Sequence, residues 1–234
     1  MDLASAKVLV TGGSSGIGLE TARQLRARGA QVAICGRNEA RVREAADAIG
    51  ALAIHADVSV EADVVRMVRQ VIDTFGGYDV LINNAGFGSF APLVETDLAE
   101  MQRVFATNVF GAMLVARESA KHFIAQNRGN IVNISSTAGQ RGFAGGTAYS
   151  ASKFALSSMT ECWRAELRKH NIRVMQVNPS EVQTEFVTNS GRPARAASDR
   201  KLQAPDIAHT IVAMLEMADR GFITEAAVWA TNPD

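Results

Sequence analysis

Six short, continuously apolar segments rich in β-branched residues recur along the chain, and longer helical patterns separate them. The predicted strands are Val8–Val10, Val32–Ile34, Leu52–Ile54, Val80–Ile82, Ile131–Ile134 and Arg173–Val177, with a short one near Ala226–Ala230. Strands that lack polar alternation are typical of a parallel sheet covered on both faces. The pattern therefore predicts an α/β fold with an open, doubly wound sheet and a ligand at the edge where the strands end.

The segments between the strands have helical periodicity. The predicted helices are Ile17–Arg28, Asn38–Ile49, Glu61–Phe75, Leu98–Gln126, Tyr149–Lys169 and Pro205–Met217. The fourth is too long for an ordinary globular helix, and Asn108 and Gly111 inside it predict a kink or local unwinding. Residues 185–203 have little periodicity, which predicts a substrate lid of loop or short helices. No linker or repeat divides the chain, so we expect one domain over residues 1–234.

Charge and cysteine content exclude several classes of protein. Lysine plus arginine (24) equals aspartate plus glutamate (24), which argues against a nucleic-acid or anionic-membrane partner. No apolar run is long enough to span a bilayer and no signal-peptide pattern is present, so we expect a cytoplasmic location. The histidines lack metal-ligand spacing, and no metal is expected. Cys35 and Cys162 lie in apolar stretches and are predicted to be buried free thiols.

A glycine-rich turn, Thr11-Gly12-Gly13-Ser14-Ser15-Gly16-Ile17-Gly18, follows the first strand and opens the first helix. Glycines here permit positive φ and let a pyrophosphate approach the free N–H groups of the helix. This position between a strand and a helix predicts a dinucleotide-phosphate site.

Tyr149 and Lys153 are four residues apart, so they share one face of the predicted helix. A neighbouring ammonium lowers the pKa of a phenol from about 10 towards the range in which proton transfer is efficient. Ser136, thirteen residues before Tyr149 (149 − 136), supplies a hydroxyl that can stabilise charge on a substrate oxygen. The three groups together suit protonation of a carbonyl during hydride transfer.

From Val8 to about Thr184, these motifs resemble the short-chain dehydrogenase/reductase family, particularly its 3-oxoacyl-ACP reductase-like members. The resemblance rests on the glycine turn, Asp57-Val58, Asn83-Asn84-Ala85-Gly86, Asn108, Ser136, Tyr149/Lys153 and Asn178-Pro179. It implies a single Rossmann-type domain with a seven-stranded, mostly parallel sheet of order 3-2-1-4-5-6-7.

The resemblance also implies residue roles. Tyr149 would be the acid in reduction and the base in oxidation, and Lys153 would also hydrogen-bond the nicotinamide ribose. Asn108 would expose a backbone carbonyl that holds a water in a proton relay with Lys153. Ser136, rather than Ser135, matches the catalytic serine. The residues implied in cofactor binding are Gly12, Ser14, Ser15, Gly16, Ile17, Gly18, Arg37, Asp57, Val58, Asn84, Ala85, Gly86, Tyr149, Lys153, Pro179, Val182 and Thr184.

The end of the second strand indicates the nicotinamide cofactor. Arg37 stands nineteen residues after Gly18 (37 − 18), and no carboxylate occupies Gly36. An arginine here can pair with the 2′-phosphate of NADP, whereas an acid would accept the ribose 2′-hydroxyl of NAD. Ser15 stands where NADP-dependent members often have a basic residue. NADP(H) is favoured, and use of NAD(H) stays open.

The segment after the sixth predicted strand departs from the family pattern. Ser180 replaces a glycine, so its backbone must avoid a glycine-only conformation or accept strain, and Glu181 is expected to be an exposed carboxylate.

The predicted pocket wall is apolar, although Arg141 could contact an anionic acyl-carrier group. The residues expected along that wall are Phe87, Phe90, Gln140, Arg141, Phe143 and Phe186.

The sequence therefore predicts an NADP(H)-dependent oxidoreductase that interconverts a ketone or aldehyde and an alcohol. A 3-oxoacyl-thioester reductase and a broad carbonyl or sugar/polyol reductase both remain open. The alternative from another class is a sensor or scaffold that binds NADP(H) without turnover. Apolar residues on several sides of Leu98–Gln126 and Tyr149–Lys169, with the family habit of pairing these helices, predict a homodimer or homotetramer.

Overall fold

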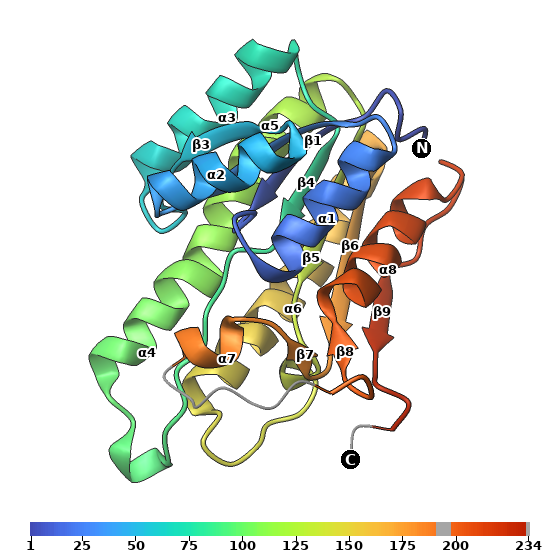
Figure 1. Ribbon diagram of the computed structural model, residues 1–234. Coiled ribbons are helices and arrows are strands. Elements are labelled where there is room, and N and C mark those ends of the chain that lie inside the picture. Colours follow the sequence, from blue (N-terminus) through green and yellow to red (C-terminus); the bar gives the residue numbers. More distant parts are fainter. Residues whose placement is uncertain (191–197, 233–234) are drawn as a thin grey trace.

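The computed structural model describes residues 1–190 and 198–232. Its main sheet has seven strands in the order β3-β2-β1-β4-β5-β6-β9, and every neighbouring pair is parallel (Figure 1). The strands are β1 (Lys7–Thr11), β2 (Gln31–Gly36), β3 (Leu52–His55), β4 (Val80–Asn83), β5 (Gly129–Ile134), β6 (Ile172–Pro179) and β9 (Glu225–Val228). The predicted strand order is confirmed. The last strand is β9 because two short strands, β7 (Val182–Gln183) and β8 (Leu202–Gln203), pair outside this sheet.

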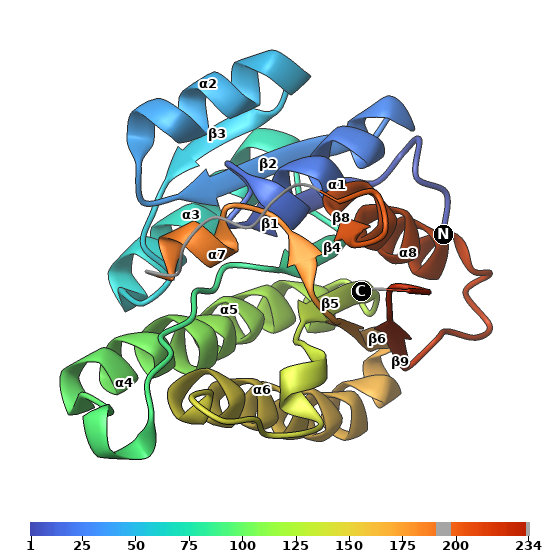
Figure 2. The same cartoon turned by 60° about the horizontal axis from the view of Figure 1, so that its bottom comes forward.

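Helices cover both faces of the sheet (Figures 1 and 2). One face packs against α1 (Gly16–Ala27), α2 (Glu39–Ile49) and α8 (Ala204–Glu216). The other packs against α3 (Glu61–Phe75), α5 (Ala112–Ala125) and α6 (Thr147–Leu167). The remaining short helices are α4 (Leu98–Phe105), α7 (Phe186–Asn189), and single turns at Leu93–Glu95, Thr137–Gly139 and Arg168–His170.

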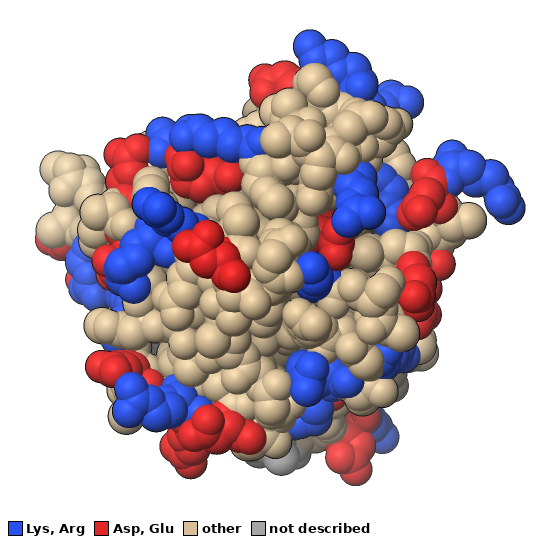
Figure 3. All heavy atoms as spheres, turned by 90° about the horizontal axis from the view of Figure 1, so that it is seen from above, with Lys and Arg blue, Asp and Glu red and all other residues tan. Residues whose placement is uncertain are grey.

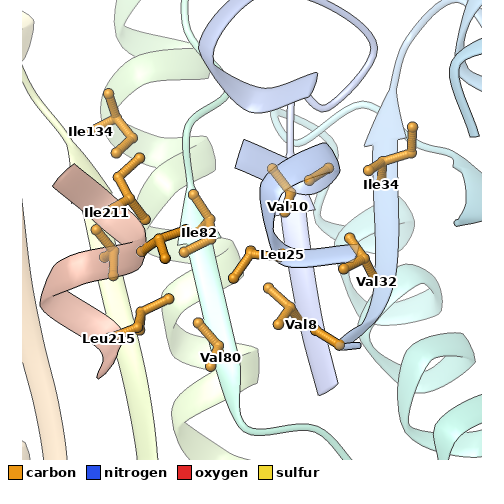
Figure 4. Close-up of a cluster of buried hydrophobic side chains, with 14 of the residues drawn as sticks. Val8, Val10, Leu25, Val32, Ile34, Val80, Ile82, Ile134, Ile211 and Leu215 are labelled. Carbon is orange, nitrogen blue, oxygen red and sulfur yellow. The ribbon is translucent and has the colours of Figure 1, made fainter. Parts of the chain in front are cut away.

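Successive side chains of a strand enter opposite halves of the core. Val8 and Val10 of β1 pack in the cluster that contains Leu25 and Ile211 (Figure 4), whereas Leu9 belongs to the cluster on the other face. All five of these side chains are fully buried. Because helices cover both faces, both sets of alternate residues must be apolar, which explains why the strands show no polar alternation.

The predicted break in the long helix is confirmed. A π-helix at Ala106–Gly111 joins α4 to α5. Gly111 packs closely against the loop after β3, since a Cβ at this position would lie 2.9 Å from Val58 Cγ2 and 3.0 Å from Val58 O. The widened turn and the missing side chain together let the helix approach that loop.

The segment predicted as a lid, 185–203, is described only in part, because residues 191–197 lie outside the described residues. Its described portions include α7 and β8, and β8 pairs in parallel with β7. The role of this segment as a lid stays a prediction.

The two cysteines have different environments. Cys35 is buried in β2, and burial raises the pKa of its thiol to about 12. The prediction that Cys162 is buried was wrong, because its side chain is exposed on α6. It comes two residues after the buried Thr160, which turns it roughly 200° around the helix, away from the core. Neither cysteine forms a disulfide.

The surface seen from above in Figure 3 has lysine and arginine interspersed with aspartate and glutamate, without a large region of one sign. Among the helices of the described residues, none combines the length and apolar character needed to cross a bilayer.

Candidate active site

A cleft of about 1080 Å³ lies at the carboxyl ends of the parallel strands. It is lined by residues that directly follow β1, β2, β3, β4, β5 and β6. Nearly every residue expected in the catalytic and cofactor-binding sets lines it. Gly18 and Asn108 are the two exceptions, and both are buried behind its wall.

Two side chains fix the glycine turn to the end of β4. Thr11 Oγ1 accepts hydrogen bonds from the backbone N–H groups of Asn84 and Ala85, both at 3.0 Å. Asn84 Nδ2 donates in return to Thr11 O at 2.9 Å and to Gly12 O at 3.2 Å. The turn and the end of β4 therefore form one rigid unit.

The shape of the turn requires glycine. Gly12 has φ +64°, and a Cβ on Gly18 would lie 2.4 Å from Gly12 O and 2.5 Å from Asn84 Nδ2. Ser15 precedes α1, and no side chain caps the first turn of this helix. In contrast, Asn38 and Asp97 cap α2 and α4. The uncapped N–H groups of α1 and the glycine cradle fit the pyrophosphate of a dinucleotide.

The end of the cleft beyond β2 is rich in arginine. Arg37 is exposed, and its guanidinium lies 5.9 Å from the centre of the Phe87 ring. Arg103, from α4, lies 5.7 Å from the centre of the same ring. Arg41 lines this end as well and forms an ion pair with Glu185. This arrangement favours a phosphate group at the end of the cleft.

A carboxylate side chain has little room at position 36. A Cβ there would be 2.9 Å from Val42 Cγ2 and 3.4 Å from Ser14 Oγ.

Asp57 and Val58 line the neighbouring part of the cleft. The Asp57 carboxylate accepts hydrogen bonds from the backbone N–H and hydroxyl of Ser59, at 2.9 and 2.7 Å, so it holds the turn that precedes α3.

Lys153 is a buried cation beside the phenol ring. Its side chain is 5% exposed, and Nζ donates a 2.8 Å hydrogen bond to Ile134 O at the end of β5. Nζ is 5.7 Å from the centre of the Tyr149 ring, one turn earlier on α6. Burial lowers the pKa of this ammonium from 10.5 to about 8, so it stays mostly protonated at pH 7.

The two serines after β5 have different partners. Ser136 lines the cleft, where its Oγ accepts a 3.1 Å hydrogen bond from Ala138 N–H and contacts Pro179 O at 3.4 Å. Ser135 Oγ lies 3.3 Å from Lys153 O and 3.2 Å from Ser157 Oγ. The weakly held hydroxyl proton of Ser136 can turn to a ligand, whereas Ser135 ties β5 to α6.

Asn108 lies in the π-helix and anchors the cleft from behind. Its Oδ1 accepts from Phe87 N–H at 3.0 Å, while Nδ2 donates to Phe87 O at 2.8 Å and to Ser152 Oγ at 3.0 Å. The side chain therefore joins the loop after β4 to α6, and both segments line the cleft.

The end of β6 and the segment that follows it close the cleft over the glycine turn. Pro179, Val182 and Thr184 line it, and a Cβ on Gly16 would lie 3.4 Å from Thr184 Cβ. Ser180 is not strained, since the described non-glycine residues with positive φ are Asn127 and Asn171. Glu181 is exposed, as expected, and forms a 3.2 Å ion pair with Lys201.

The predicted wall residues line the cleft, but sequence reasoning missed others. Thr11 stood in the motif without an assigned role. Arg41, Arg103, Lys201 and Trp229 also line the cleft. Arg41 and Arg103 lie four residues after Arg37 and five residues before Asn108, and Lys201 lies in the predicted lid, but no motif residue type marks any of the four as a cleft residue.

The comparisons with known proteins agree with this geometry. A family model described as short chain dehydrogenase matches residues 6–194. The uncharacterized oxidoreductase YxnA of Bacillus subtilis strain 168 is 35% identical over 187 residues, which cover 76% of this chain and only about half (52%) of YxnA.

Two solved structures cover nearly the whole chain. The 3-ketoacyl-(acyl-carrier-protein) reductase from Brucella melitensis, complexed with NADH, has a TM-score of 0.88 at 28% identity and covers 97% of this chain and 98% of that one. A metagenomic short-chain oxidoreductase in complex with NADP has a TM-score of 0.84 at 33% identity, with the same coverages. Together with the matched family model, these likenesses show that the chain belongs to the short-chain dehydrogenase family of oxidoreductases.

Proposed function

We propose that this protein is an NADP(H)-dependent oxidoreductase that interconverts a ketone or aldehyde and an alcohol. The observation that carries the proposal is that Tyr149, Lys153 and Ser136 line the same cleft as the glycine turn, which leads into the uncapped helix α1. One end of the cleft suits a dinucleotide phosphate, and the other brings an acid, a cation and a hydrogen-bond donor together.

The bound nicotinamide would supply or accept the hydride. Tyr149 donates its hydroxyl proton to the carbonyl oxygen in reduction and removes it in oxidation. Ser136 donates a hydrogen bond to the same oxygen and stabilises the charge that develops there. Lys153 favours the phenolate form of Tyr149, and its charge acts strongly because the ammonium is shielded from water.

Asn108 has a positioning role in this proposal. Its side chain fixes the loop after β4 to α6. The π-helix in which it lies supports a second role, in which its backbone carbonyl holds a water that relays protons to Lys153.

The choice of NADP(H) over NAD(H) rests on the exposed Arg37 and on the crowded site at Gly36, where an acid would stand in an NAD-selective protein. A cytoplasmic location belongs to the same proposal, supported by the two free cysteines.

Replacing Tyr149 by phenylalanine removes the proton donor and little else. We expect Tyr149→Phe to lower turnover by roughly 10³-fold or more, while NADPH binding measured by fluorescence titration stays unchanged. Turnover is followed by NADPH absorbance across ketones, aldehydes and 3-oxoacyl thioesters. Near-normal activity of the variant would show that the acid is misassigned. A wild-type protein that binds NADPH tightly and turns over nothing in the panel would favour the sensor alternative.

The cofactor preference is tested at Arg37. Arg37→Ala should weaken NADPH binding by about 1.5–3 kcal/mol, roughly 10- to 150-fold, because a charge-assisted bond to the 2′-phosphate is lost. NADH binding should change little. Arg69→Ala, an exposed arginine on α3, is the control. Equal effects of Arg37→Ala on both cofactors would contradict the assignment.

We also propose a homodimer or homotetramer formed through the long helices. Phe110 in the π-helix and Phe154 in α6 are 56% and 46% exposed, although both are large apolar side chains. Light scattering after size exclusion should give two or four times the chain mass of 25.0 kDa, and the double variant Phe110→Glu/Phe154→Glu should dissociate. A single 25.0 kDa wild-type species would overturn the assembly.

A further inference from the structure

The part of the cleft around Tyr149 is walled by aromatic rings from three separate segments. Phe90 comes from the loop after β4, Phe143 from the loop before α6, and Phe186 from α7. The ring centres of Phe90 and Phe186 lie 5.4 and 5.3 Å from that of Tyr149. Phe90 also lies 6.1 Å from Phe143 and 6.5 Å from Phe186. The three phenylalanines, called the aromatic wall below, therefore make a continuous apolar surface beside the hydroxyl-bearing ring.

Two glycines leave the space that the rings of this wall occupy. A Cβ on Gly88 would lie 2.6 Å from Phe90 Cε2 and 3.0 Å from Phe186 Cζ. A Cβ on Gly146 would lie 2.6 Å from Phe143 Cζ. Each ring therefore packs directly against the backbone of a glycine, in space that any larger residue's side chain would occupy.

The loops that carry the wall are joined to each other. Ala91 N–H donates a 3.0 Å hydrogen bond to Gly145 O, and Ala91 forms a parallel bridge with Gly146. Phe90 directly precedes Ala91, and Phe143 lies two residues before Gly145. Because the loops form one unit and the rings are already in place, little conformational freedom is lost when an apolar ligand packs against them.

Two polar side chains that line this part of the cleft, Gln140 and Lys201, already have partners. Gln140 Nε2 donates to Glu225 at 2.6 Å, and Lys201 pairs with Glu181 at 3.2 Å. Trp229 lines the cleft as well and is 61% exposed, so apolar surface continues outwards. A substrate with many hydroxyls would lose water against the aromatic wall and regain few hydrogen bonds, which disfavours its binding.

We propose that the substrate carries its carbonyl on an aromatic or alicyclic apolar ring, and that the aromatic wall selects it. This inference rests on the function proposed above and narrows it. It disfavours sugars and polyols for the reason just given. It also disfavours acyl-carrier thioesters. Among the residues that the structure describes on this side of the cleft, Lys201 is already paired with Glu181, and Arg141 is exposed, where an ion pair with a phosphate contributes little.

The test compares kcat/KM for 1-tetralone and 2-methylcyclohexanone with that for D-fructose and acetoacetyl-CoA, using NADPH and the full chain. We expect kcat/KM for the ring ketones to be higher by about 100-fold or more, because the apolar wall binds an apolar ring better than a polar substrate of similar size. Tyr149→Phe must abolish the turnover.

The wall is tested by variants that keep the fold. Phe143→Ala and Phe186→Ala should raise KM for 1-tetralone by about 10-fold and leave KM for butanone within threefold, because the smaller ketone leaves most of the wall uncovered. Gly88→Ala displaces two rings without removing them and should have the same signature. Val65→Ala, an exposed apolar position on α3, is the control, and NADPH binding checks that each variant is folded.

Each outcome decides the question. Preference for ring ketones that disappears in the wall variants supports the inference. Tyr149-dependent turnover of D-fructose or acetoacetyl-CoA at least as fast as that of the ring ketones would overturn it and leave the proposed function standing. Wall variants without effect on KM would also overturn it. NADPH binding without turnover of any substrate would overturn both.

Discussion

The ammonium of Lys153 is the constraint around which this structure is organised. It is almost completely removed from water, and burial lowers its pKa to about 8, so at neutral pH the protein holds a charge where charge is unfavourable. Its hydrogen bond to Ile134 O holds the start of α6 against the end of β5. The apolar clusters on both faces of the sheet supply the stability that offsets this burial.

The parallel topology brings the other elements of the site to the same place. The carboxyl ends of β1, β4 and β5 are neighbours, so the glycine turn, Asn84 and Ser136 meet although they are far apart in sequence. Thr11 and Asn84 then fix the turn, and Asn108 fixes the adjacent loop to α6. In our account, this rigid frame positions a nicotinamide cofactor, and the aromatic wall positions an apolar ketone against it.

Much of this could be predicted from the sequence, because the signals are local. Continuous β-branched runs indicated a parallel sheet, and Asn108 with Gly111 indicated the helix break that became a π-helix. Properties that depend on the packing of distant segments could not be predicted. Cys162 lies in an apolar stretch but on the outer side of α6, and Arg103 enters the cleft from a helix without a motif. The phenylalanines could be named as wall residues, but their seats on Gly88 and Gly146 appear only in three dimensions.

The cost of burying the Lys153 ammonium is measured most directly by the pH dependence of apo-protein stability for wild type and Lys153→Met. Since the folded-state pKa lies below the usual 10.5, the burial penalty is complete below about pH 8 and disappears as the pH approaches 10.5. We predict that the variant loses turnover but is more stable at pH 7 by about 2 kcal/mol, less than the roughly 3 kcal/mol that the shift represents because a hydrogen bond is also lost. The difference should shrink between pH 8 and 10.5. A variant that is less stable than wild type, by an amount independent of pH, would show that Lys153 acts as a structural hydrogen-bond donor and not as a buried charge that lowers stability.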